Sequence, residues 1–174
     1  KRGVSRADAG DGRIHTRFAR QDSHGAARLY ARETAMKVER LFLRAKQHAP
    51  PQAIGRALLV SGGGMALDWR AEGDQALSLW DFDAQKRAEH GGKGLCRQRF
   101  FANIIISGLA DARLHTGDAL AIGGAVVQIT QIGKRCFPEC ALSAEEALAC
   151  PLLSCAFAKV EQGGAVSAGD AVSR

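Results

Sequence analysis

The chain has 174 residues, of which 46% are hydrophobic, enough for one globular domain with a well-buried core. No apolar run approaches the roughly 18 residues that a membrane-spanning helix needs, so we expect no membrane partner. The formal net charge is +6, but residues 1–36 hold eight basic and four acidic residues and therefore carry most of it. The remaining sequence is only weakly basic, so we expect no nucleic-acid partner.

Residues 1–36 differ in composition from the rest of the chain. They are rich in Arg, Gly, Ala and Asp and contain few large apolar side chains. This composition is typical of a flexible, solvated segment, although a short helix over residues 26–35 is an alternative. MKVERLFLRA, which begins at Met36, reads like the natural start of a folded domain. We therefore predict a flexible basic segment at 1–36 and one domain at 37–174.

Glycine and proline divide the next part of the chain into short segments. Strands are predicted at 38–43, where a helix is an alternative, and at 57–60 and 76–80. The glycine loop at 61–64 could cradle an anion, but no Lys-Ser or Lys-Thr pair follows it as in a phosphate loop. A tight turn with positive φ is the simpler interpretation. Asp81 or Asp83 should cap a helix that continues to about His90 and ends at Gly91–Gly92.

The second half of the chain favours strands even more strongly. Residues 103–107, with the sequence NIIIS, form the next predicted strand, and a glycine pair at 123–124 should join strands 120–122 and 125–132 as a hairpin. A capping box at 143–146 starts a short helix that Pro151 ends. Strands at 156–160 and 165–172 follow. Frequent short strands and only two or three short helices predict a mainly β fold, an antiparallel barrel or sandwich.

The stretch VVQITQIGKRCFPEC, residues 126–140, places a thiol directly after a predicted strand. Lys134 and Arg135 precede Cys136, and a nearby cation favours the thiolate over the thiol. We therefore expect the pKa of Cys136 to fall from about 8.5 toward neutrality, and we assign Cys136 as the candidate catalytic nucleophile. The alternative is a buried thiol that only packs. Cys140 could resolve a persulfide or oxidised form of Cys136, donate a second ligand, or only pack.

The five cysteines are an odd number, unlike the disulfide framework of a small secreted protein. With no signal-peptide pattern, we expect reduced thiols and a cytoplasmic protein. A zinc site from Cys136, Cys140, Cys150 and Cys155 is an alternative, but neither pair has the two-residue spacing typical of zinc knuckles. Cys96 follows a glycine turn and receives no predicted role. The histidines are scattered without ligand spacing, so no metal ligand is assigned.

Several segments, in this order, resemble the MOSC family, named for the C-terminal domain of molybdenum cofactor sulfurase. The resemblance covers about residues 37–174. It rests on the opening strand and glycine loop at 38–68, DQALSLW at 74–80, FFANIIISGL at 100–109, TQIGKRC at 130–136 with Cys140, and the closing segments at 150–160 and 163–172. The chain departs from the family pattern at Asp74, Ala102, Arg135 and Phe137, where Arg, Glu, Glu and His are usual.

The resemblance implies a MOSC-like β-barrel whose key cysteine is Cys136. It implies a sulfurtransferase-type sulfur carrier in the metabolism of a molybdopterin-type molybdenum or tungsten cofactor. The implied partners are a cysteine desulfurase or other sulfur donor and a molybdenum or tungsten enzyme; pyridoxal phosphate binding is linked only to the family as a whole. The alternative is a non-catalytic module that binds the anionic cofactor for delivery or insertion. The candidate cofactor-binding residues are Lys134, Arg135, Asn103, Gly63, Gly64 and Asp68.

Overall fold

The computed structural model describes residues 35–70, 72–90, 94, 96, 99–137, 139–140, 142 and 144–174. Internal contacts divide the chain into two units, Lys1–Arg32 and Glu33–Arg174. The predicted flexible segment falls almost entirely outside the described residues. The first strand of the second unit begins at Met36.

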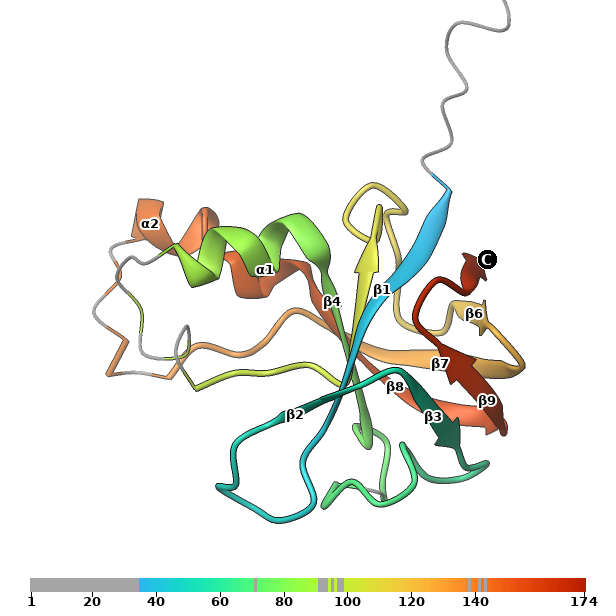
Figure 1. Cartoon of the computed structure of the whole chain (residues 1–174). Helices are drawn as coiled ribbons and strands as arrows, with labels where there is room; N and C mark the ends of the chain where they lie inside the picture. The colour runs from blue at the N-terminus through green and yellow to red at the C-terminus, as the bar shows by residue number, and fades with distance from the viewer. Residues whose placement is uncertain are drawn as a thin grey trace, which may run out of the picture. The chain divides into compact units, whose positions relative to one another are not determined.

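In the described part of the chain, seven strands close into a barrel (Figure 1). Around the barrel they follow one another as β10 (Ala171–Ser173), β6 (Ala119–Ile122), β7 (Ala125–Ile132), β8 (Cys155–Gln162), β4 (Leu77–Asp81), β5 (Ile104–Ser107) and β1 (Met36–Leu43), and β1 pairs back with β10. Neighbouring strands are antiparallel, except that β4 and β5 are parallel. The predicted mainly β barrel is confirmed.

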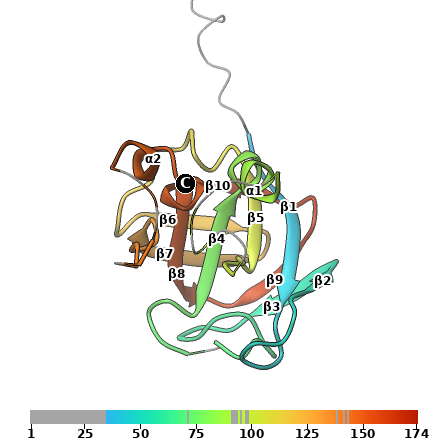
Figure 2. The same cartoon turned by 90° about the vertical axis from the view of Figure 1, so that its left-hand side faces the viewer.

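Three further strands flank the barrel. β2 (Gln52–Ile54) pairs with β1, and β3 (Arg56–Leu59) pairs with β9 (Gly164–Ser167) in a separate two-stranded sheet. Figure 2 shows β2 and this two-stranded sheet on the side of β1. β2 was not predicted. The predicted strand 165–172 is instead two strands, because Gly169 adopts φ +94° in a turn that the Asp170 side chain closes by accepting a hydrogen bond from Ser167 N at 2.8 Å.

Short helices cover one face of the barrel. α1 (Phe82–Glu89) begins as predicted, because Asp81 Oδ1 accepts a hydrogen bond from Ala84 N at 3.0 Å. α2 (Ala144–Leu148) and the 3-10 helix η2 (Pro151–Ser154) follow β7, so the predicted short helix ends three residues before Pro151, and Pro151 itself begins a separate helical turn. The predicted capping residue Ser143 and the predicted stop at Gly91–Gly92 lie outside the described residues. None of the helices in the described ranges has the length and apolar character to cross a bilayer.

Two clusters of buried side chains explain the sequence pattern. One fills the barrel and includes Leu79, Ile104 and Ile106; the other lies under α1 and includes Trp80 and Ile105. Because β4 and β5 are covered on both faces, they read as continuous apolar runs rather than as alternating ones. Trp80 also ties the second cluster to η2, since its indole Nε1 donates to Pro151 O at 2.9 Å.

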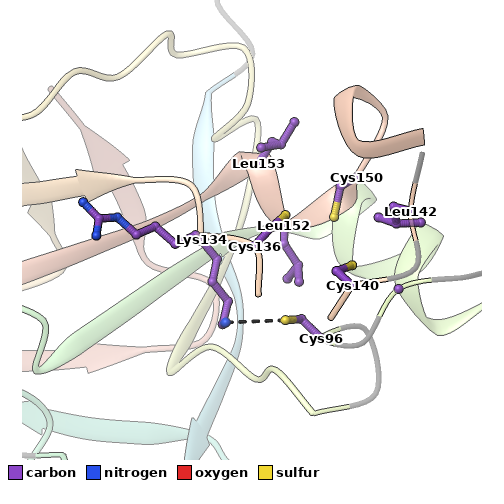
Figure 3. A pocket seen from close by; sticks show the side chains of 10 residues that line it. Cys96, Lys134, Cys136, Cys140, Leu142, Cys150, Leu152 and Leu153 are labelled. Atoms are coloured by element: carbon purple, nitrogen blue, oxygen red, sulfur yellow. Dashed lines mark hydrogen bonds between the residues drawn. The ribbon is translucent and has the colours of Figure 1, made fainter. Parts of the chain in front are cut away.

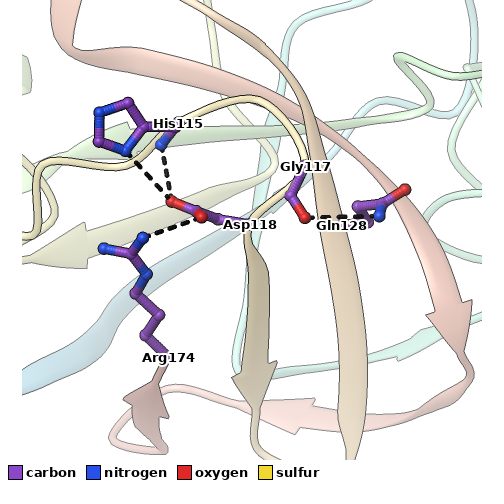
Figure 4. A network of polar contacts seen from close by, with 5 residues as sticks. All are labelled: His115, Gly117, Asp118, Gln128 and Arg174. Carbon is purple, nitrogen blue, oxygen red and sulfur yellow. Dashed lines mark hydrogen bonds and ion pairs between the residues drawn. The ribbon is translucent and has the colours of Figure 1, made fainter.

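A polar network joins the segment before β6 to the residue after β10 (Figure 4). Asp118 accepts hydrogen bonds from His115 N at 2.7 Å and from Arg174 Nη2 at 2.9 Å. The His115 amide and the charge of Arg174 hold the pKa of the Asp118 carboxyl below its usual value. Gln128 Nε2 donates to Gly117 O at 3.4 Å and attaches the same turn to β7. These contacts fix one end of the barrel and lie apart from the thiols.

Candidate functional site

The site begins where β7 ends. Gly133 adopts φ +70°, and a side chain there would lie 3.4 Å from Leu153 O, so the position favours glycine. After the turn the main chain stays attached to the neighbouring elements, because Gly133 N donates to Cys155 O at 2.7 Å and Lys134 N donates to Leu152 O at 3.2 Å. The segment that carries Cys136 therefore leaves the barrel beside η2.

Four thiols border a small pocket at this exit, which we call the thiol pocket (Figure 3). Its volume is about 10 Å³, room for roughly one water-sized particle. Its walls are formed by Gly94, Cys96, Lys134, Arg135, Cys136, Cys140, Leu142, Cys150, Leu152 and Leu153. The predicted pair Cys136 and Cys140 thus comes together with Cys150, which the zinc alternative grouped with them, and with Cys96, for which no role was predicted.

Cys155 is different from the other cysteines. All five are free thiols, but Cys155 is fully buried and its Sγ donates a hydrogen bond to Leu152 O at 3.0 Å. Burial raises the pKa of this thiol to about 12. Cys155 is therefore a packing residue, and the predicted alternative of a zinc site that includes it lacks this ligand. Within the described ranges, no three His, Cys, Asp or Glu side chains are arranged to hold a metal ion.

The predicted low pKa of Cys136 is wrong. Although Cys136 is exposed, the pKa of its thiol is raised, first by partial loss of hydration and then by the thiols of Cys140, Cys150 and Cys96. Lys134 acts in the opposite direction but is the weakest of these influences. Lys134 has this weak influence because of the direction of its side chain, which the sequence does not specify.

Lys134 contacts Cys96 rather than Cys136. Its ammonium Nζ lies 3.4 Å from Cys96 Sγ, as the dashed line in Figure 3 marks. The same Nζ lies 4.3 Å from the centroid of the Phe137 ring, a cation–π contact that holds the side chain in place. Residues 38 positions apart in the sequence are thus joined by one charge-assisted contact. No local sequence pattern could have indicated this pair.

A second cavity adjoins the thiol pocket and shares Cys96 and Lys134 with it; we call it the arginine–aromatic pocket. Its volume is about 280 Å³. It is lined by Arg44, Trp69, Arg70, Cys96, Arg99, Phe100, Phe101, Lys134 and Phe137, so four cations and four aromatic rings border it and none of these described lining residues is acidic. Such a lining suits a planar anion.

Two arginines of this pocket are held on one aromatic ring. The guanidinium carbons of Arg44 and Arg70 lie 3.9 and 5.0 Å from the centroid of Phe101. Burial lowers the pKa of Arg70, and the nearby charge of Arg44 adds to this effect while Asp68 opposes it. The Nε atoms of both arginines are buried without a hydrogen-bond partner in the described part of the chain. Buried donors of this kind are normally satisfied, so they mark a place for an acceptor.

A third cavity, an open groove, connects the thiol pocket and the arginine–aromatic pocket to solvent. It has a volume of about 730 Å³ and is lined by Arg70, Gln75, Phe100, Gln131, Lys134, Arg135, Cys136, Phe137 and Phe157. Cys136 therefore faces both the thiol pocket and the groove. The predicted site residues Lys134 and Arg135 line the same two cavities.

The other predicted cofactor-binding residues lie behind these walls. Asp68 is buried and accepts hydrogen bonds from Arg44 N, Arg70 N and the side-chain amide of Asn103 at 2.9, 3.0 and 3.0 Å. Asn103 in turn accepts from Ser78 N and Oγ. Neither Asp68 nor Asn103 lines a cavity described above, so these two residues position the arginines from behind.

The glycine loop is also separate from the cavities. Gly62 has φ +72°, as the turn interpretation predicted, and Gly63 N donates to Val60 O at 3.0 Å. A side chain at Gly64 would collide with the carbonyl of Ala76. Gly64 therefore allows close packing of two backbone segments, and the predicted cofactor contact of Gly63 and Gly64 stays a prediction.

Comparisons with known proteins agree with this fold. The MOSC domain family model matches residues 68–173. The solved structure of the YUAD protein from Bacillus subtilis is similar with a TM-score of 0.59 and 16% identity over 79% of this chain and 94% of that chain. YiiM from Escherichia coli is similar with a TM-score of 0.53 and 17% identity over 79% of this chain and 70% of that chain.

At these identities the two structures support the fold alone. A comparison with curated protein sequences finds no match. The family match, by contrast, covers more than half of the chain and includes the end of β7, the four residues Lys134 to Phe137, and β8. The chain therefore belongs to the MOSC domain family.

Proposed function

We propose that this protein carries sulfane sulfur on Cys136 in the metabolism of a molybdenum or tungsten cofactor. The observation that supports this assignment is the position of Cys136. Of the five cysteines it is the exposed one, and it faces both the small thiol pocket and the open groove. A donor can therefore approach it from solvent, while three further thiols lie behind it. The link to molybdenum or tungsten comes from the MOSC family.

The loading step is a thiol exchange. The Cys136 thiolate attacks the terminal sulfur of a donor persulfide, such as that of a cysteine desulfurase; the donor thiolate leaves and Cys136 holds the transferred sulfur as a persulfide. Lys134 and Arg135 line the same cavities and favour the negative charge of the attacking and product sulfur. The cofactor is the substrate that ultimately receives the sulfur, not a resident group.

Loading should place a trappable persulfide on Cys136. The protein is mixed with a cysteine desulfurase and cysteine, quenched with an alkylating agent at early times, and examined by peptide mass. We expect the adduct on Cys136 in the wild type and at least about tenfold less total adduct in Cys136→Ser. Cys155→Ala is the control, because Cys155 is buried and does not line the thiol pocket. Equal adduct in wild type and Cys136→Ser contradicts the proposal.

The same assay has an expected pH dependence. Because partial loss of hydration and the thiols of Cys140, Cys150 and Cys96 raise the pKa of Cys136, with Lys134 opposing them, little thiolate is present at neutral pH. The loading rate should therefore rise throughout the range from about pH 7 to 9. A rate that is already flat at pH 7 would show a thiol with a low pKa.

The arginine–aromatic pocket supports a second candidate, a module that binds an anionic molybdopterin-type cofactor. The residues fit such a group: Trp69 and Phe101 offer faces for a planar pterin, and Arg44 and Arg70 offer unpaired, buried Nε donors for a phosphate. The pocket volume of about 280 Å³ lies near the lower end of ligand sites. In this function Cys136 need not carry sulfur.

A phosphorylated pterin is the probe for this second function. We expect saturable quenching of its fluorescence by the wild type and an affinity at least about tenfold weaker for Arg70→Gln, since one charge-assisted hydrogen bond contributes about 1.5–3 kcal/mol. The control is Arg56→Gln, because Arg56 is exposed on β3 and lines none of the cavities described above. Unchanged affinity for Arg70→Gln would remove this candidate, whereas Cys136→Ser should bind normally.

A further inference from the structure

We propose that Cys96 is a second reactive thiol, which attacks the Cys136 persulfide and releases the sulfur as hydrosulfide, with Lys134 as its positioning residue. This inference rests on the proposed sulfur-carrier function and deepens it. It specifies the oxidation state in which sulfur leaves and the class of partner, a dithiol reductant, that each turnover requires.

Lys134 places a positive charge next to the thiol of Cys96. Thiolates, not thiols, attack sulfur–sulfur bonds, and a neighbouring ammonium favours the thiolate. Lys134 Nζ lies 3.4 Å from Cys96 Sγ and is itself held by the Phe137 ring. Among the described residues that line the thiol pocket, Cys96 is the one whose thiol contacts a cation in this way.

The second step concerns the space between the thiols. Cys96 and Cys136 both border the thiol pocket, and Figure 3 shows their thiols grouped with those of Cys140 and Cys150. The pocket of about 10 Å³ is comparable to one small atom, such as the outer sulfur of a persulfide. Leu152 and Leu153 form apolar walls. A persulfide on Cys136 is thus placed beside a second nucleophile and shielded on one side from water.

The proposed reaction balances. The Cys96 thiolate attacks Sγ of the Cys136 persulfide; the Cys96–Cys136 disulfide bond forms as the bond from Cys136 Sγ to the outer sulfur breaks, and that sulfur leaves as HS⁻. The outer sulfur gains two electrons, and the two cysteine sulfurs together lose two. A dithiol reductant then reduces the disulfide and restores both thiols. Hydrosulfide has the oxidation state of a sulfido ligand on a metal, so the product suits a metal-bound acceptor.

The other cysteines are weaker candidates for this step. Cys155 is buried and donates its hydrogen to Leu152 O. Cys150 and Cys140 line the pocket, but in the described part of the chain neither is contacted by a cation in the way that Cys96 is. Cys140 exerts the larger electrostatic influence on Cys136 and is therefore the competing resolving thiol.

A single-turnover experiment tests the proposal. Each protein is loaded by a catalytic amount of cysteine desulfurase with cysteine, without other reductant, and released sulfide and intact mass are followed. For the wild type we expect about one sulfide per chain, after which release stops and a Cys96–Cys136 disulfide is present; adding a dithiol restores release. Cys96→Ser should retain the persulfide and release sulfide at least about tenfold more slowly.

Variants of Lys134 separate positioning from mere structural support. Lys134→Met should slow sulfide release in the same way as Cys96→Ser, because it removes the charge next to the Cys96 thiol. Lys134→Arg keeps this charge and should therefore release sulfide at nearly the wild-type rate. Arg56→Gln, on exposed β3 and outside the three cavities, is the control and should release sulfide as the wild type does, whereas Cys140→Ser tests the competing resolving thiol. If Cys96→Ser destabilises the fold, Cys96→Ala replaces it.

The outcomes distinguish the two levels of the proposal. If neither the wild type nor any variant forms a persulfide, the sulfur-carrier function is wrong and this inference is wrong with it. If the wild type holds a stable persulfide and Cys96→Ser behaves identically, the inference alone is overturned. Loss of release only in Cys140→Ser would assign the step to Cys140. Stoichiometric metal in the purified wild type that Cys96→Ser lacks would assign these thiols to a metal site and also overturn the proposal.

Discussion

Replacing Asp68 by alanine should lower the free energy of unfolding by about 3–5 kcal/mol, because it leaves several buried donors without an acceptor. The carboxylate is 4% exposed and accepts from Arg44 N, Arg70 N and Asn103 Nδ2. Asn103 is 0% exposed and cannot turn to water instead. Equilibrium unfolding in denaturant measures the loss, and the same variant should weaken phosphorylated-pterin binding because both arginines lose their backbone anchor.

Two further variants make this result interpretable. Asp68→Asn keeps one acceptor oxygen but brings a donor toward other donors, so its loss of stability should be smaller than that of Asp68→Ala but still measurable. Asp111→Ala removes an exposed carboxylate that has no partner among the described residues and should change stability by less than about 0.5 kcal/mol. A loss below about 1 kcal/mol for Asp68→Ala would show that water replaces the carboxylate, and that the arginines are not fixed from behind.

The barrel strands were predictable because their signals are local. β-branched runs and glycine turns indicated β7 and its hairpin with β6, and the apolar run at 104–106 indicated a strand buried on both faces. β2 gave no such signal, since its three residues are largely exposed and form a strand only because β1 offers an edge to pair with. Barrel closure, through the β1–β10 pairing, joins the two ends of the domain, which no local pattern encodes.

The candidate site likewise has a part that the sequence indicates and a part that only the fold brings together. Cys136, Lys134 and Arg135 are consecutive or nearly so, and the sequence placed them together after a strand. Cys96 joins them only through the fold, and Arg44 and Arg70 meet through the ring of Phe101. The error about the pKa of Cys136 has the same origin, because spacing places Lys134 next to Cys136, whereas in the fold its side chain reaches Cys96, 38 positions away in the sequence.

The repeated sequence GGAV at 123–126 and 163–166 leads to the second large expected effect. The two copies lie against each other: Gly124 N donates to Ala165 O at 2.9 Å, and a side chain at Gly164 would collide with the carbonyl of Gly124 and lie 2.9 Å from Ala125 N. Gly164→Ala should therefore lower the free energy of unfolding by about 2–4 kcal/mol, since backbone on both sides must move. Thermal and denaturant unfolding measure this loss.

Gly55→Ala is the matched control for this variant. No atom lies within 4 Å of a side chain added at Gly55, and its φ is not positive, so the change should be neutral or stabilise the fold by up to about 1 kcal/mol. A similar small effect for Gly164→Ala would mean that β9 does not cross the β6–β7 hairpin so closely. The expected contrast assigns the repeated glycines to the crossing of two backbones. It also explains why two short copies occur without any larger internal repeat: each copy supplies one side of the same contact.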